Sequence, residues 1–384
     1  MYLLDYLGSE FSSFDEVPFG PVDSAALSQV CMVRAEGLVP TLDEAKRGRL
    51  ARAAHNLLPR ARATARFVDL LRAERYADMF TGLAPARVKD NLLALAASPR
   101  FRELELHDYA ATFDVDAQTQ FAALTFSRGK DFSYVGFRGT DTTITGWREN
   151  FNMACNAEVP AQRAALSYLE AVARRTKGRL IVGGHSKGAN LAAYAALKAS
   201  PEVQERIERV YLHDGPGFKE GAISDEEWAR LAGRIHRTVP QESVVGMLME
   251  CPVPAHVVRA TSHGFDQHSP FTWEIEGDDF VYADKLADSS QLFDTVMTEW
   301  LSQYSDEEAA TIVDALFKAV EASGTTNASA IFFSGLKIVP LITRAAQNID
   351  EESRAVLTAA LGSLAEITAR NAGKGIMERF GGRG

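Results

Sequence analysis

The feature that most constrains this 384-residue chain is a serine between a short apolar run and an alanine-rich segment. The apolar run at 180–182 has the composition of a buried strand, and residues 189–199 have strong helix propensity. Between them stands Gly-His-Ser-Lys-Gly at 184–188. In a nucleophile elbow, the serine sits on a strained strand-to-helix turn, and small residues on either side let strand and helix cross closely. The pattern predicts that Ser186 is an exposed nucleophile.

This glycine-rich turn has two other interpretations. A phosphate-binding loop requires Lys followed by Ser or Thr after its second glycine. The chain has Ala-Asn at 189–190 instead, which excludes that loop. The remaining alternative is a glycine-rich turn that carries an idle serine.

Composition limits the partners and the compartment. A net charge of −10 and the lack of a basic stripe argue against nucleic acid as a partner. Three scattered cysteines predict a reducing compartment without a disulfide framework, and none has metal-ligand spacing to another Cys or to His. We therefore expect no metal and no cofactor. The N-terminus lacks the features of a signal peptide, so we predict a cytoplasmic protein.

The order of predicted elements indicates an α/β protein. Residues 1–98 look helical, with one helix predicted from 42 to about 75, and residues 106–113, 120–126 and 132–137 look like three antiparallel strands. From residue 146 helices and strands alternate, which implies a mostly parallel sheet with helices on both faces. After about residue 283 the chain returns to helices. We predict an N-terminal helical segment (1–98), a core (99–284) and a C-terminal helical extension or cap (285–384), together one compact unit.

One apolar segment in the C-terminal part is ambiguous. Residues 331–342 are too short to span a bilayer and contain Lys and Pro, so no transmembrane segment is predicted. The segment fits a buried helix, and the alternative is a lid or a surface that touches a membrane peripherally.

A serine nucleophile needs an orienting acid, and two residues in the expected order after the serine qualify. Asp214 follows an apolar run and precedes Gly-Pro-Gly, at a strand end where ligand-facing residues of an open sheet gather. Glu242 follows the next predicted strand and is the alternative acid. Asp214 is favoured because a short side chain beside glycines can be held more rigidly.

The base is expected in the loop at 262–273, which contains two histidines. His268 is favoured because Pro270 and two aromatic residues follow it, and His263 is the alternative. A neutral imidazole with a pKa near 6.5 can accept the serine proton at neutral pH.

The oxyanion hole needs two backbone N–H groups. One is expected from Lys187, directly after the nucleophile, and the other from Thr140 in the loop after the strand at 132–137. The side chain of Lys187 is expected to be solvated or to reach toward the substrate rather than to act as a base. For Arg138 a structural ion pair with Glu149 is the alternative to a functional role.

With these motifs placed, the chain resembles the class 3 (fungal-type) lipase superfamily. It is more closely similar to a bacterial family of uncharacterised lipase-like proteins, domain of unknown function 2974. The resemblance covers the first residues to about 280 and is carried by residues 5–7, 21–23, 137–153, 183–193, 214–218, 239–248 and 267–273.

The resemblance implies an α/β-hydrolase fold and a serine esterase or lipase mechanism. It implies Ser186 as nucleophile, His268 as base and Thr140 in the oxyanion region. Class 3 lipases carry their acid at a position where this chain has Ser243, and this departure favours Asp214, or Glu242 one residue earlier.

The sequence thus predicts a serine hydrolase that cleaves a small-molecule or lipid ester through an acyl-enzyme on Ser186. A thioesterase or amidase remains open, because the triad does not determine the leaving group. A hydrolase-like protein that binds a lipid or acyl ligand without turnover is the third interpretation. The substrate's head group and chain length, the role of residues 285–384 and the oligomeric state are left open.

Overall fold

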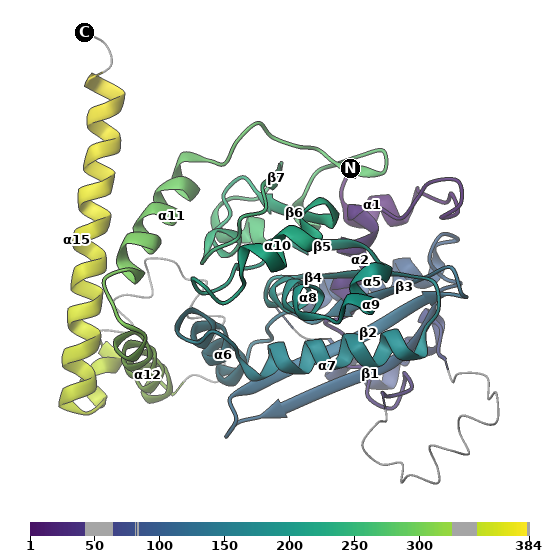
Figure 1. Cartoon of the computed structure of the whole chain (residues 1–384), viewed down its shortest axis with the longest axis horizontal. Helices are drawn as coiled ribbons and strands as arrows, with labels where there is room; N and C mark the ends of the chain where they lie inside the picture. Colours follow the sequence, from purple (N-terminus) through teal and green to yellow (C-terminus); the bar gives the residue numbers. More distant parts are fainter. Residues whose placement is uncertain (43–63, 81, 83, 325–343, 382–384) are drawn as a thin grey trace.

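The computed structural model describes residues 1–42, 64–80, 82, 84–324 and 344–381, and at its centre lies a seven-stranded sheet (Figure 1). The strands stand side by side in chain order, and the first three pair antiparallel while the others run parallel. Their bounds are β1 (Glu105–Asp114), β2 (Thr119–Arg128), β3 (Phe132–Phe137), β4 (Arg179–His185), β5 (Ile207–His213), β6 (Ile235–Pro240) and β7 (Ala255–Val258). The predicted mostly parallel sheet with an antiparallel beginning is therefore confirmed.

Side chains that alternate along the strands fill two cores, one on each face of the sheet. Phe137, Val182 and Leu212 pack with the helices α7 (Pro160–Arg175) and α8 (Lys187–Lys198). Tyr134 and Ile181 belong to the opposite core. Because successive side chains of a strand point to opposite faces, both faces of these strands are apolar, as a sheet covered by helices on both sides requires.

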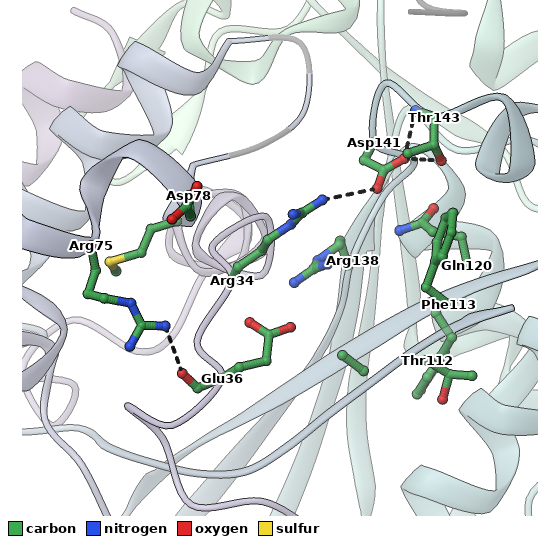
Figure 2. Close-up of a pocket in the computed structure, with 13 residues that line it drawn as sticks. Arg34, Glu36, Arg75, Asp78, Thr112, Phe113, Gln120, Arg138, Asp141 and Thr143 are labelled. Atoms are coloured by element: carbon green, nitrogen blue, oxygen red, sulfur yellow. Dashed lines mark hydrogen bonds and ion pairs between the residues drawn. The ribbon is translucent and has the colours of Figure 1, made fainter. Parts of the chain in front are cut away.

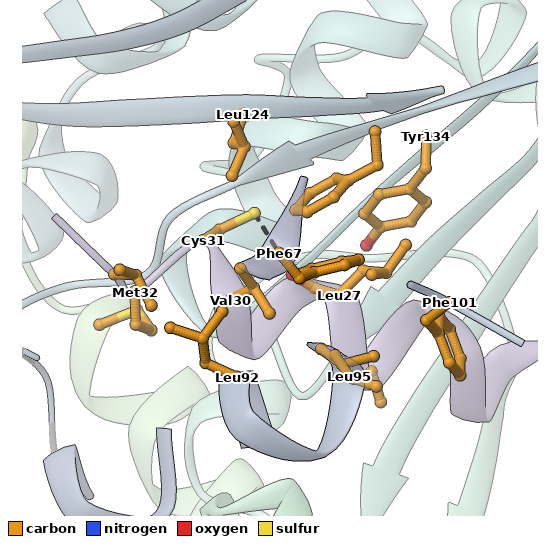
Figure 3. Packing of buried hydrophobic residues seen from close by; sticks show 14 of the residues in the cluster. Leu27, Val30, Cys31, Met32, Phe67, Leu92, Leu95, Phe101, Leu124 and Tyr134 are labelled. Carbon is orange, nitrogen blue, oxygen red and sulfur yellow. Dashed lines mark hydrogen bonds between the residues drawn. The ribbon is translucent and has the colours of Figure 1, made fainter. Parts of the chain in front are cut away.

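Short N-terminal helices cover the second face. They are α1 (Leu3–Leu7), α2 (Pro21–Val30) and α5 (Pro85–Ala97), with α4 (Tyr76–Met79) and the 3₁₀ turns η1 (Phe67–Leu70) and η2 (Ala73–Arg75). Figure 3 shows side chains from these segments, including Leu27, Phe67 and Leu95, packed against Leu124 and Tyr134 of the sheet. Most of the helix predicted between 42 and 75 lies outside the described residues.

The C-terminal helices lie at the edge of the molecule (Figure 1). They are α11 (Asp288–Leu301), α12 (Asp306–Ala322) and α15 (Glu351–Gly381), with the 3₁₀ turn η8 (Ala346–Asn348). One of them, α12, packs against α6 (Ile144–Cys155). The ring of Phe317 on α12 lies 5.5 Å from the ring of Phe151 on α6. In Figure 1, α15 stands away from the sheet, with α11 and α12 between them. The apolar segment 331–342 lies outside the described residues.

Shorter elements complete the core region. They are α9 (Pro201–Arg206), α10 (Asp225–Leu231), η3 (Ala232–Arg234), η4 (Val245–Met247), η5 (Gly264–His268), η6 (Pro270–Thr272), β8 (Ile275–Glu276) and β9 (Asp279–Phe280). Among the helices that the model describes, none combines the length and apolar character needed to cross a membrane.

Candidate active site

Ser186 stands on a sharp turn between β4 and α8. Its backbone has φ 61° and ψ −133°, a conformation that costs a residue with a side chain about 1–3 kcal/mol. Its amide donates to the carbonyl of His213 at the end of β5, 2.9 Å away, and this bond fixes the turn at the carboxyl end of the sheet. The geometry matches the elbow that the motif predicts.

The two glycines around the serine are needed for close approach between backbones. A Cβ added at Gly184 would lie 2.3 Å from the carbonyl carbon of Gly188, and one added at Gly188 would lie 2.2 Å from the carbonyl oxygen of Phe137. Neither residue has a positive φ, so crowding alone requires glycine at both positions.

We expect Gly184→Ala to lower the free energy of unfolding by about 1–3 kcal/mol or more, because overpacked backbone cannot relax as a side chain can. Urea unfolding of the purified variant measures the change. Gly233→Ala is the matched control, because a Cβ at Gly233 would meet nothing within 4 Å. Equal stability of the two variants would contradict the crowding argument.

His268 and Asp214 are brought together although 54 residues separate them. His268 Nδ1 lies 2.6 Å from Asp214 Oδ2, and both side chains are almost wholly buried. A carboxylate accepts, so the proton of a neutral His268 ring lies on Nδ1 and leaves Nε2 as the basic nitrogen. This is the tautomer that a general base for a serine requires.

The loop after β6 completes the surroundings of the Asp214 carboxylate. Its Oδ1 accepts from the hydroxyl of Ser243 at 2.5 Å and from the amide of Gly246 at 3.1 Å. Its own amide donates to Thr238 at 2.7 Å. The side chain of Ser290 on α11 in turn donates to the carbonyl of Ser243 at 2.5 Å. Each oxygen of the buried carboxylate therefore has a donor, as a buried charge needs.

The backbone carbonyl of His268 is hydrogen-bonded to the side chain of His185, the residue before the nucleophile. His185 Nε2 lies 2.7 Å from the carbonyl oxygen of His268, and the two rings are 4.5 Å apart. A carbonyl only accepts, so His185 Nε2 is the donor. Burial holds the pKa of His185 well below its usual range, which keeps this ring neutral.

The alternative acid, Glu242, and the alternative base, His263, contact each other. Glu242 Oε1 lies 3.4 Å from Nδ1 of His263, whose side chain is 91% exposed. Glu242 Oε2 accepts from the amide of Gly264 at 2.6 Å. The structure thus places Glu242 and His263 at the surface of the same loops and Asp214 with His268 in the interior.

The loop that carries Thr140 passes directly beside the elbow. A Cβ added at Gly139 would lie 3.5 Å from Cβ of Ser186. Within the described residues, neither the amide of Thr140 nor that of Lys187 donates to another protein group. The Thr140 hydroxyl bonds with the side-chain amide of Asn150, 2.7 Å from Nδ2. Both predicted oxyanion amides are therefore without a protein acceptor among the described residues.

Two side-chain predictions were wrong. Lys187 is not solvated, because its side chain is 1% exposed and forms an ion pair with Glu149. Arg138 does not pair with Glu149; it donates to the carbonyls of Cys31 and Val33 and to the Tyr109 hydroxyl. Both errors arose because the true partners come from segments far away in the sequence.

A cavity of about 580 Å³ is lined in part by Arg138, Asp141 and Thr143 of the loop after β3 (Figure 2). Cationic and acidic residues line it in equal number, and Arg34 lies 3.9 Å from Asp141 across it. Ser186, Asp214 and His268 are not among the described residues of its lining. The geometry around the elbow, rather than this cavity, defines the candidate active site.

None of the hydrogen bonds between described residues involves the Ser186 hydroxyl, and His268 is bonded through Nδ1 to Asp214. Catalytic hydrogen bonds of free enzymes are often loose and tighten only with substrate. The described residues also contain no group of three or more His, Cys, Asp or Glu side chains arranged for a metal ion.

Sequence reasoning did not find four supporting residues, namely Glu149, Asn150, His185 and Ser243. His185 lies inside the elbow motif, and Ser243 holds the position where the resembled lipases carry an acid, so both had a signal. Glu149 and Asn150 lie inside the stretch 137–153 that carries the family resemblance, but nothing local indicated their partners, which are 38 and 10 residues away.

A strand, a strained serine turn and a helix at the carboxyl end of a mostly parallel sheet together define an α/β-hydrolase fold. A family model described as Mbeg1-like matches residues 95–318, more than half of the chain, and the chain belongs to the Mbeg1-like family. The narrower resemblance to domain of unknown function 2974 and a bacterial source stay predictions.

Two solved structures are similar to this chain at low identity. "Crystal structure of M37 lipase" is 14% identical, covers 60% of this chain and 70% of its own, and has a TM-score of 0.34. A lipase propeptide complex of Rhizomucor miehei is 16% identical, covers 44% of this chain and 66% of its own, and has a TM-score of 0.31. A comparison with curated proteins finds no match.

Proposed function

We propose that this protein is a serine hydrolase that cleaves carboxylic esters through an acyl-enzyme on Ser186. The observation that carries the proposal is the buried contact of 2.6 Å between His268 Nδ1 and Asp214 Oδ2. It places the proton of a neutral His268 ring on Nδ1 and leaves Nε2 as the basic nitrogen, which is the tautomer that a general base for Ser186 requires.

In the first half-reaction, the Ser186 oxygen attacks the ester carbonyl while His268 Nε2 accepts the hydroxyl proton. The buried Asp214 stabilises the imidazolium that forms without taking the proton itself. Collapse of the tetrahedral intermediate breaks the bond to the alkoxide, which leaves as an alcohol with the proton from His268. In the second half-reaction water repeats the sequence and releases the carboxylic acid.

The negative oxygen of each tetrahedral intermediate needs hydrogen-bond donors that are already in place. The amides of Lys187 and Thr140 are the candidates, because each is without a protein acceptor among the described residues. One such donor contributes about 10²–10³ in kcat.

A thioester or amide substrate would use the same residues, since leaving-group preference depends on the shape of the pocket. The position of the Lys187 side chain gives no support to a ligand-binding protein without turnover. Lys187 does not project into the substrate region; it is buried against Glu149. A lipid or small-molecule ester remains the proposed substrate class, and the cytoplasmic location stays a prediction.

Labelling with a serine-directed fluorophosphonate tests the proposal. We expect the wild type to incorporate one label per chain at Ser186 and Ser186→Ala to incorporate none, because only an activated hydroxyl displaces fluoride. Intact mass measurement gives the stoichiometry, and a peptide map gives the site. A folded wild type that neither labels nor hydrolyses p-nitrophenyl esters would overturn the proposal in favour of a binding protein.

A further inference from the structure

A lysine–glutamate pair lies in the interior directly behind the proposed nucleophile. Lys187 and Glu149 are both 1% exposed at their side chains and form an ion pair. Lys187 Nζ also donates to the carbonyl of Gln120 at 2.7 Å. Lys187, whose amide is the first oxyanion candidate, is therefore fixed in two places. The elbow fixes its backbone, and the ion pair with Glu149 fixes its ammonium group.

Glu149 connects four elements. Its Oε2 accepts from the amide of Gln120 at the start of β2, 2.9 Å away, and its Oε1 accepts from the amide of Ala161 at the start of α7, 3.0 Å away. The carboxylate lies on α6 and pairs with the first residue of α8. Both carboxylate oxygens of Glu149 accept hydrogen bonds, which fixes the position of the carboxylate. The Lys187 ammonium group paired with it is fixed as well.

The next residue of α6, Asn150, contacts Thr140, whose amide is the other oxyanion candidate. Asn150 bonds with the hydroxyl of Thr140 through its side-chain amide. Neighbouring residues of one helix thus contact the two residues whose amides would bind the oxyanion. Because a helix is a rigid element, α6 can fix the separation of the two donors.

Stability alone does not explain the ion pair. Burial of two charges costs desolvation free energy, and an apolar pair of similar volume is often as stable or more so. Burial also lowers the pKa of Lys187, because desolvation disfavours the charged ammonium. A role in geometry fits the observations better than a role in stability.

We infer that the Lys187–Glu149 pair is a positioning device for the oxyanion hole, with α6 as the frame that sets the two donors relative to each other. Neither side chain touches substrate. The inference rests on the proposed function, since it requires an oxyanion to be stabilised.

Lys187→Met and Glu149→Gln test the inference, with the double variant Lys187→Met/Glu149→Gln to remove both charges at once. We expect kcat for a p-nitrophenyl ester to fall about 10- to 100-fold with little change in KM, because a misplaced donor weakens only the transition state. The affinity for a trifluoromethyl ketone, which forms a tetrahedral adduct on the serine, should fall by the same factor. Rates are expressed per folded molecule.

The matched control is Lys198→Met/Glu227→Gln, which removes a lysine–glutamate pair 2.8 Å long at the other end of the same helix. It should leave kcat and ketone affinity unchanged. Folded Lys187 and Glu149 variants that lose stability but keep wild-type kcat and ketone affinity would overturn the inference and leave the proposed function standing. A wild type without esterase activity or ketone binding would overturn both.

Discussion

Replacement of His268 by alanine is expected to lower kcat for a p-nitrophenyl ester roughly 10⁴-fold or more, because it removes the group proposed to accept the serine proton. The backbone contact with His185 survives this change, since it uses the carbonyl of residue 268. Asp214 Oδ2 loses its donor, so a modest loss of stability accompanies the loss of rate. Steady-state kinetics and a thermal melt separate the two effects.

His263→Ala is the matched control for this prediction. His263 lies on the same loop five residues earlier, and its side chain is 91% exposed. We expect its removal to change kcat by less than about threefold, as a solvated side chain outside the site should. If His263→Ala lost the activity and His268→Ala kept it, the assignment of the base would be reversed.

The elbow could be predicted because its determinants are local. Glycines on both sides of Ser186, an apolar run before it and alanines after it all stand in consecutive residues, and the structure adds the close backbone distances that require the glycines. The sheet was predictable for the same reason, since apolar runs and their connections decide whether strands pair antiparallel or parallel. The register shift between His107 and Ala110 on β1 had no such signal.

The surroundings of the serine could not be predicted in the same way. Whether Lys187 is solvated depends on a carboxylate 38 residues earlier in the chain, and a lysine beside an elbow serine is indistinguishable in sequence from a substrate-facing one. Burial of a charge is decided by tertiary partners, so propensity and spacing carry no information about it. The same limit left the choice between Asp214 and Glu242 to general arguments about rigidity.

The choice between Asp214 and Glu242 as the acid that orients the base can be tested directly by substitution. Asp214→Asn is expected to lower kcat about 10³- to 10⁴-fold with the fold intact. The amide of Gly246 can only donate to the side chain at 214, so an asparagine keeps its oxygen there and turns its NH₂ group toward His268. His268 Nδ1 must then accept, which moves the ring proton to Nε2 and removes the basic nitrogen from the serine's side.

Glu242→Gln is the matched control, because Glu242 is the rival acid and contacts His263 and the amide of Gly264 instead. It should retain kcat within about threefold, since none of its contacts reaches His268. Steady-state kinetics of both variants, with far-ultraviolet circular dichroism to establish folding, decides between the two acids. A large loss in Glu242→Gln beside an active Asp214→Asn would mean that the buried contact of Asp214 with His268 only supports the fold, and that the acid acts from the surface loop.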